Sequence, residues 1–590
     1  MLARSTLWVP ALASALPLYA LTSALSIPIL ASRANGYNHA MSIAAPRWVG
    51  VAGLLGVLAG AIVLMAAPGN PGALRLSGVS LLWWYTAGVA PLGAILLIVM
   101  VRCLPAEIAD DTNAWAVAAA WTSPAVLGLV GAGVFSGAPG APAIALAVLV
   151  GPLVARLDPA AAEPLRPSVV ARLAIIVGIG LVLWANFLLL VDVARLLGLP
   201  RWPTSLVVAA VALLVSVLLR ERPAAASRVS LAGAASVAFV ALAAVVGIAL
   251  ATSPWGAWKS VASRPALTFG ERDPWVTTGR TLAAPVVLDF TELHRVTALS
   301  LAIYRVDEPG RFREWQLREG ESLTLRAGDR LMLDAGTRLR FEAGKRVPGA
   351  AASGVAWADP PERSAPLTVA ETIGTTLTLV AGALVLVGPA RPTTIRGASA
   401  LLPATVLGAV CLGVYGVYTA PGLSIGAPAL APVFYVPATV VSGTAGRVLA
   451  WLTALVLLAL LAATMLALRG ILGGACGARG ELTQRVMTGL VVAAAVASLW
   501  PVDASWALLT GLGLMASAVV APRLASDEPV ARLIGSLVGA TAFVCLAVLR
   551  LPAWASVAGA YPAVTAAPLA WIAARVGRGI ARAGGIARAV

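Results

Sequence analysis

Long runs of apolar residues, separated by short polar segments, make up most of the chain. A helix that crosses about 30 Å of hydrocarbon needs about 20 such residues. About fifteen runs have or approach this length: 8–31, 48–67, 81–101, 114–135, 141–155, 173–195, 204–220, 229–252, 368–388, 398–418, 447–468, 486–500, 505–521, 530–549 and 555–574. The pattern predicts a polytopic α-helical membrane protein with about 15 transmembrane helices. Residues 8–31 exceed a usual signal-peptide core, so we expect them to remain as the first span.

One polar segment, residues 253–366, interrupts this pattern. The residue pattern around 286–288, 298–301 and 323–325 is typical of short β-strands. In an eight-residue near-repeat, Ala-Gly pairs recur from Ala327, Ala335 and Ala343, and we expect the units to form successive tight hairpins. The sequence thus predicts one inserted β-rich domain, a small sandwich or partial barrel. The predicted domains are an N-terminal membrane domain of about 8 spans (1–252), the β-rich domain (253–366) and a C-terminal membrane domain of about 7 spans (367–590).

Composition excludes a soluble fold and gives no sign of nucleic-acid binding. Hydrophobic residues make up 59% of the chain and charged residues 12%, whereas soluble domains carry about 25% charged residues. The net charge is +16, but the β-rich segment is nearly balanced, with 16 basic and 14 acidic residues. The remaining 26 basic and 12 acidic residues lie mostly in short loops and at the C-terminus. This placement is the positive-inside signal of membrane topology, not a basic surface for phosphates.

Arginine positions predict the orientation of the chain. Arg575, Arg578, Arg582 and Arg588 cluster at the C-terminus, which we therefore place in the cytoplasm. Counting back through the apolar runs puts most other Arg-rich loops on the same side. It puts the N-terminus and residues 253–366 outside. The predicted location is the bacterial cytoplasmic (inner) membrane, with the β-rich domain extracytoplasmic, in the periplasm.

Histidine and cysteine usage predicts neither a metal site nor a cofactor. The chain has two histidines, His39 and His294, and neither lies in a predicted span, where a membrane haem would need its axial ligands. The four cysteines are scattered and form no Cys-x-x-Cys pair. We therefore expect no bound cofactor.

Few ionisable or strongly polar residues lie within the predicted spans. Asp192 stands near the outer end of its run with Arg195 one helical turn away, which predicts an ion pair at the membrane interface. Thr368 and Glu371 have the spacing of a capping box at a helix start. Thr372 begins a polar stripe below them. A role of these five positions in ion coupling or in a polar groove is the alternative to the structural interpretation.

Residues 397–446 contain no charged residue, and four prolines interrupt their second half, 419–446. A stretch of this kind on the outer side should not lie exposed in water. It is either packed within the protein as a re-entrant element or forms an outer apolar surface that contacts lipid or a partner. The aromatic side chains that would form this surface are Tyr415, Tyr418, Phe434 and Tyr435.

The sequence predicts a role in a membrane assembly more readily than a reaction. No nucleophile–base pair, phosphate-binding glycine loop or acidic pair is visible, so we expect the chain not to be a catalyst itself. We expect a non-catalytic subunit, anchor or assembly factor of a cell-envelope complex, with the β-rich domain and the 419–446 loop as its outer docking face. Its expected partners are membrane lipids and proteins on the outer face, without nucleic acid. The alternative is a transporter or flippase for an apolar or lipid-like molecule.

Overall fold

The computed structural model describes residues 38–76, 79–102, 121–138, 140–157, 167–221, 268–269, 280–281, 286–308 and 366–386. It also describes 228–242, 311–348, 408–436 and 444–583, each with internal gaps. Seven helical spans in this part of the chain are long and apolar enough to cross a membrane. They lie in α2 (Asn38–Ala66), α8 (Val169–Leu196), α9 (Arg201–Glu221), α13 (Pro366–Leu386), α16 (Thr444–Ala475), the continuous α18 (Ala504–Met515), η4 (Ala516–Val520) and α19 (Ala521–Ala525), and α20 (Pro529–Val548).

Several other predicted spans fold as shorter or more polar helices. They are α3 (Leu81–Trp84) continuing through η2 (Tyr85–Val89) into α4 (Ala90–Arg102), α6 (Pro124–Phe135), α7 (Ala141–Leu157), α17 (Gly480–Ala497) and α22 (Ala563–Ala583). The run 8–31 lies outside the described residues, as do most of 229–252 and 398–418. The architecture is therefore that of a helical membrane protein, while the count of about 15 spans stays a prediction.

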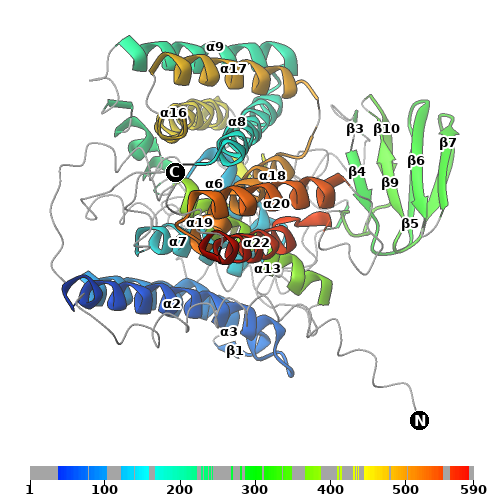
Figure 1. Cartoon of the computed structure of the whole chain (residues 1–590). Coiled ribbons are helices and arrows are strands. Elements are labelled where there is room, and N and C mark those ends of the chain that lie inside the picture. The colour runs from blue at the N-terminus through cyan, green and yellow to red at the C-terminus, as the bar shows by residue number, and fades with distance from the viewer. Residues whose placement is uncertain are drawn as a thin grey trace.

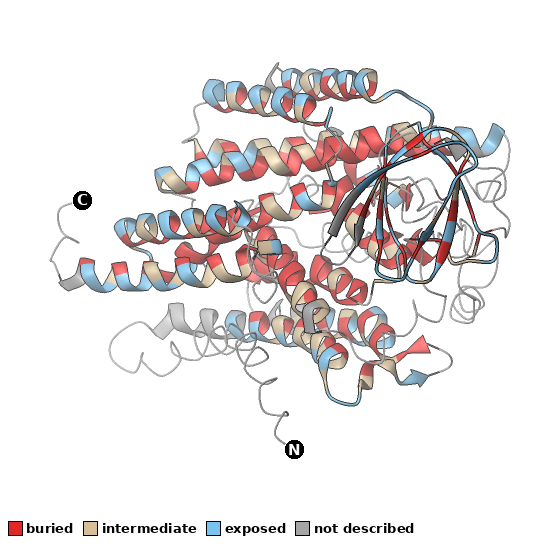
Figure 2. Ribbon diagram, turned by 90° about the vertical axis from the view of Figure 1, so that its right-hand side faces the viewer, coloured by how far each residue is buried: buried red, intermediate tan, exposed pale blue. Residues whose placement is uncertain are grey.

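The helices pack around α8 and the α18–α19 span, which are the most buried of the seven spans. Figure 2 shows buried residues concentrated in the middle of the bundle and exposed residues on its outer helices. α8 and α18 run antiparallel. Trp184 meets Trp506 edge-on at 6.2 Å near one end of the pair, and Gly178 meets Gly511 further along. The end of α8, the starts of α9 and α18 and the end of α17 therefore lie together.

A β sandwich stands beside this end of the helix bundle (Figure 1). One sheet has the order β3-β10-β5-β8 and the other β4-β9-β6-β7. The strands are β3 (Arg280–Thr281), β4 (Val286–Asp289), β5 (His294–Ala298), β6 (Ala302–Glu308), β7 (Arg311–Leu317), β8 (Ser322–Leu325), β9 (Arg330–Leu333) and β10 (Arg338–Phe341). Buried side chains from both sheets form one core, among them Tyr304 and Leu331 of the second sheet and Val296 and Leu339 of the first. The predicted β-rich insertion is present.

The eight-residue repeat does not form the hairpins that the sequence predicts. β8, β9 and β10 follow one another along the chain, yet they belong alternately to the two sheets and do not pair with each other. The first two repeats instead carry the chain from one sheet to the other through turns with glycine in the left-handed region, at Gly328 (φ 94°) and Gly336 (φ 86°). The third turn, at Gly344 (φ 78°), leads from β10 to the bridge between Arg346 and Thr268. The Gly328 N–H bonds the carbonyl of Phe290, which lies outside the repeat. This long-range bond favours a crossing over a local hairpin.

Replacing Gly336 by alanine should destabilise the sandwich by about 1–2 kcal/mol, the cost of a left-handed backbone for a residue with a Cβ atom. The Cβ atom itself would meet open space, with no heavy atom within 4 Å, so strain is the whole effect. Gly336→Asn should cost less, because asparagine tolerates this conformation. Pulse proteolysis of the full chain in urea measures both values. Equal stability of Gly336→Ala and wild type would contradict the assignment.

Candidate functional site

A buried group of charged side chains lies where α8 ends and α9 begins. Asp192 is 2% exposed. Its Oδ1 lies 3.9 Å from Nη1 of Arg195 and 3.9 Å from Nη2 of Arg201. The pairing of Asp192 with Arg195 is the one that their spacing predicts. Arg201 was not expected, because only the turn after α8 brings it back beside Asp192.

Arg201 also joins this charged group to α17. Its Nε donates to the carbonyl of Ser498 at 2.8 Å and its Nη2 to that of Trp500 at 2.9 Å. Ser205, one helical turn further along α9, donates to the carbonyl of Ala495 at 2.8 Å. These side chains satisfy carbonyl groups that the end of a helix leaves without partners. Asp503 accepts from the Ser505 amide at the start of α18. The charged group therefore holds the ends of α8, α9 and α17 together, and Asp503 caps α18 separately.

The second predicted polar group, on α13, is only partly as expected. The helix begins at Pro366, so Thr368 lies inside it and does not cap its start. The predicted capping box of Thr368 and Glu371 is therefore wrong, because proline favours the first position of a helix and starts it two residues earlier. Thr368 instead accepts, through its carbonyl, a 2.8 Å bond from the Thr372 hydroxyl. Glu371 is half-buried and Thr372 is buried.

This stripe of α13 faces other helices. Gly140, just before α7, lies directly against the Thr372 side chain. Tyr561, just before α22, hydrogen-bonds Thr375, and a Cβ atom on Gly374 would lie 2.8 Å from the Tyr561 ring. No sequence pattern indicates Tyr561 or Gly140 as part of this contact, because neither belongs to a polar pattern of its own. The stripe is a helix contact at the same end of the bundle as Asp192.

The proposed outer aromatic surface does not include Phe434. This side chain is 1% exposed, and its ring lies 3.3 Å from the position of a Cβ atom on Gly128 of α6. Its place on an outer surface is corrected to one inside the helical domain, because the small glycine lets the ring approach α6 closely. Tyr415, Tyr418 and Tyr435, with most of 419–446, lie outside the described residues.

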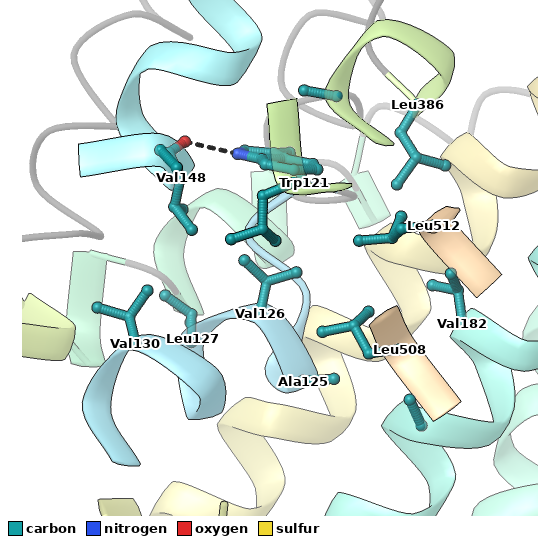
Figure 3. Packing of buried hydrophobic residues seen from close by; sticks show 14 of the residues in the cluster. Trp121, Ala125, Val126, Leu127, Val130, Val148, Val182, Leu386, Leu508 and Leu512 are labelled. Atoms are coloured by element: carbon teal, nitrogen blue, oxygen red, sulfur yellow. Dashed lines mark hydrogen bonds between the residues drawn. The ribbon is translucent and has the colours of Figure 1, made fainter. Parts of the chain in front are cut away.

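The start of α6 lies inside the bundle, although the sequence predicts a full span over 114–135. Ser123, which precedes the helix, is 1% exposed. Its neighbour Trp121 is fully buried and donates from Nε1 to the Val148 carbonyl at 2.7 Å, among the apolar side chains of Figure 3. The Ala125 amide in the first turn bonds Oδ1 of Asn186 on α8 at 3.0 Å. Asn186 lies ten residues before the end of α8, about 15 Å along the helix axis. α6 is therefore a half-length helix with a buried start.

The described residues offer little for metal or thiol chemistry. Nowhere in that part of the chain do three His, Cys, Asp or Glu side chains come together in a group that could hold a metal. Cys476 and Cys545 are free thiols, and Cys545 is exposed on α20. The polar groups near Asp192 and Thr372 are thus better suited to joining helices than to binding a metal.

Comparisons with known proteins leave the chain without a family. No protein-family model matches it. No curated protein and no solved structure matches it either. Its function must therefore be inferred from its own residues.

Proposed function

We propose that the chain is a non-catalytic integral subunit, anchor or assembly factor of a cell-envelope complex, and that its β sandwich docks a partner protein. The sandwich stands beside the helix bundle (Figure 1), and the outer faces of its sheets carry exposed side chains. The buried polar groups at the helix ends support the same role. They lock helices to each other at the side where the sandwich stands, which suits a rigid anchor.

The observation that carries the proposal is the outer face of the β4-β9-β6-β7 sheet. Val287 is 49% exposed and Ile303 is 45% exposed on this face. Between them Met332 pairs with Val287 on one side and Arg305 on the other. Arg305 in turn forms an exposed 3.4 Å ion pair with Glu314 at the edge strand. Apolar side chains within a charged rim are characteristic of the centre and border of protein interfaces.

We also propose that the sandwich lies outside the cytoplasm. Gly535 near the start of α20 touches Ala574 in the second half of α22. Arg532 and Arg575, which lie near these residues, are therefore close together, and the helix directions place them at the end of the bundle away from the sandwich. Basic residues of membrane proteins gather on the cytoplasmic side. In a cysteine-free background, single cysteines at Glu321 and at Arg575 should be labelled from opposite sides of the membrane. Labelling from the same side would contradict this orientation.

Purification in mild detergent, followed by mass analysis, tests the docking role. Wild-type protein should carry stoichiometric protein partners, and the Val287→Glu/Ile303→Glu variant should lose them while the chain itself remains folded. The matched control is Thr324→Glu, an exposed position on the other sheet, which should keep the partners. A wild-type chain that purifies alone, or a partner insensitive to the double variant, would contradict the proposal.

One observation favours the second candidate function, a transporter or flippase for an apolar or lipid-like molecule. Half-length helices that begin at mid-membrane are used by transporters to build binding sites, and α6 begins beside the buried Asn186. The same purification separates the two candidates. A lone chain that carries an enriched lipid, and loses it in an Asn186→Leu variant, would support transport over docking.

A further inference from the structure

His294, the first residue of β5, is enclosed by aromatic rings. The side chain has no exposed surface. Its ring centroid lies 5.4 Å from that of Phe269, 5.3 Å from Phe290 and 5.8 Å from Phe341. Neither Nδ1 nor Nε2 has a hydrogen-bond partner. A buried polar group without a partner costs free energy, and a protonated imidazole in the same place would cost far more.

The rings around His294 also hold the two places where the chain joins the sandwich. Phe269 belongs to a short segment before β3, on the side of the preceding membrane domain. Its amide donates to the Lys345 carbonyl at 2.7 Å, and its carbonyl accepts from the Gly344 amide at 2.8 Å. Thr268 forms a β-bridge with Arg346. We name Thr268–Phe269 together with 344–346 the joint, because the chain runs on from both segments toward membrane helices.

Phe269 and His294 form one packing unit within the joint. The Phe269 ring stacks on Phe341 at 4.5 Å with an angle of 2° between the ring planes, and both rings touch His294. On the other side of the joint, the Arg346 amide donates to Oε1 of Glu292 at 2.6 Å. A change at His294 therefore acts directly on Phe269 and, through Phe341 and Glu292, on the return segment.

We propose that His294 makes the joint acid-sensitive, so that proton uptake by its imidazole releases Thr268–Phe269 from 344–346 while the rest of the sandwich stays folded. The inference is independent of whether a partner docks on the outer sheet face. Its consequence is a sandwich that is fixed to the helices at neutral pH and loosely tethered in mild acid.

The charges around the ring act in both directions. Glu292 and Glu342 favour the protonated ring, whereas Lys345 disfavours it. Arg346 lies beside Glu292 and offsets part of its attraction. Burial is the largest effect and lowers the pKa of His294 below its usual value of 6.5. The closed joint therefore holds a neutral imidazole.

The sign of the pH dependence follows from this direction. Once the joint opens, water reaches the ring and its pKa returns toward about 6.5, so the open form binds more protons than the closed form. The stability of the joint is thus constant above about pH 7 and falls as the pH drops through about 6.5. At pH values below the lowered pKa of His294 in the closed form, the stability of the joint no longer changes and is at its minimum.

Hydrogen exchange of the full chain in detergent micelles tests the proposal. Between about pH 7.5 and about pH 5, the open fraction reported by the Phe269 and Gly344 amides, corrected for intrinsic exchange, should rise roughly tenfold. His294→Phe should abolish the rise, since phenylalanine fills the same space without a titratable group. His39→Phe, which removes the other histidine of the chain, is the matched control and should behave as wild type.

A further amide and a further variant separate opening of the joint from other effects. The Gly320 amide bonds the Ala298 carbonyl at the far end of β5 and should not change; if it rises equally, the whole sandwich unfolds and the joint proposal is wrong. If His294→Phe does not fold, Glu342→Gln should move the midpoint of opening to lower pH, because it removes an attraction for the proton. An acid response that survives in His294→Phe, or an unmoved midpoint in Glu342→Gln, overturns the proposal.

Discussion

Replacing Gly511 by valine should prevent α18 from packing on α8 and should abolish the folded membrane domain. A Cβ atom on Gly511 would lie 2.8 Å from the Gly178 carbonyl oxygen and 2.9 Å from Cβ of Leu181. Both contacts are with rigid atoms, so the two helices would have to separate. In a membrane, close packing rather than the hydrophobic effect holds helices together. Overpacking commonly costs about 1–3 kcal/mol, and a valine at the most buried crossing should exceed this range.

Size-exclusion chromatography in detergent and thermal unfolding measure this effect. Gly511→Val should give little monodisperse protein, and Gly511→Ala should lower the melting temperature clearly. Gly489→Ala on α17 is the matched control, because a Cβ atom there meets no heavy atom within 4 Å and alanine favours the helix by about 1 kcal/mol. A Gly511→Val protein as stable as this control would show that α8 and α18 do not cross at these glycines.

Asp192→Ala should destabilise the helical domain by about 3–5 kcal/mol, the usual cost of breaking a buried ion pair from one side. The variant leaves the Arg195 and Arg201 side chains, each 17% exposed, without their shared counter-charge. Arg201 would keep its hydrogen bonds to the carbonyl groups at the end of α17. The loss of stability therefore measures the missing charge of Asp192 and not a loss of these hydrogen bonds. Asp192→Asn keeps the shape of the side chain and removes its charge, so its stability should lie between those of the wild type and Asp192→Ala. Thermal unfolding in detergent, with melting temperatures compared across variants, gives the result.

An exposed ion pair supplies the control for this prediction. Arg485 and Glu481 approach to 2.6 Å on α17 with side chains 74% and 68% exposed. Such pairs contribute about 0–1 kcal/mol, so Glu481→Gln should barely change stability. If Asp192→Ala costs no more than Glu481→Gln, the charged group does not hold the helix ends together.

The apolar runs were sufficient to predict where most helices lie, because length and hydropathy are local properties of the chain. The same is true of the ion pair between Asp192 and Arg195, which one helical turn brings together. The half-length α6 could not be predicted in this way. Its start is fixed by Asn186, a residue 61 positions away from Ala125 that satisfies its amide, and no apolar window contains that information.

The sandwich shows the same division between local and long-range information. The strands predicted at 286–288 and 323–325 are present, since the side-chain pattern is a local signal. The strand predicted at 298–301 is wrong, because β5 ends at Ala298 and the chain bends there before β6. Which strands pair is not a local property of the sequence. The eight-residue repeat therefore predicts hairpins, although its strands do not pair with one another. Similarly, the uncharged sequence around Phe434 does not show whether its side chain lies on an outer surface or packs against Gly128 of α6.

Because β8, β9 and β10 alternate between two sheets, the strands of the sandwich can pair only in a certain order during synthesis. β6 and β7 can pair as soon as they are made, because their partners, such as Glu308 and Arg311, are close in sequence. β10 is the last strand and lies between β3 and β5, and Arg338 pairs with Thr281 far upstream. Such non-local pairing folds slowly. β5 can already pair with β8 before β10 is made. The segment therefore leaves the ribosome with β3, and one edge of β5, unpaired until β10 follows.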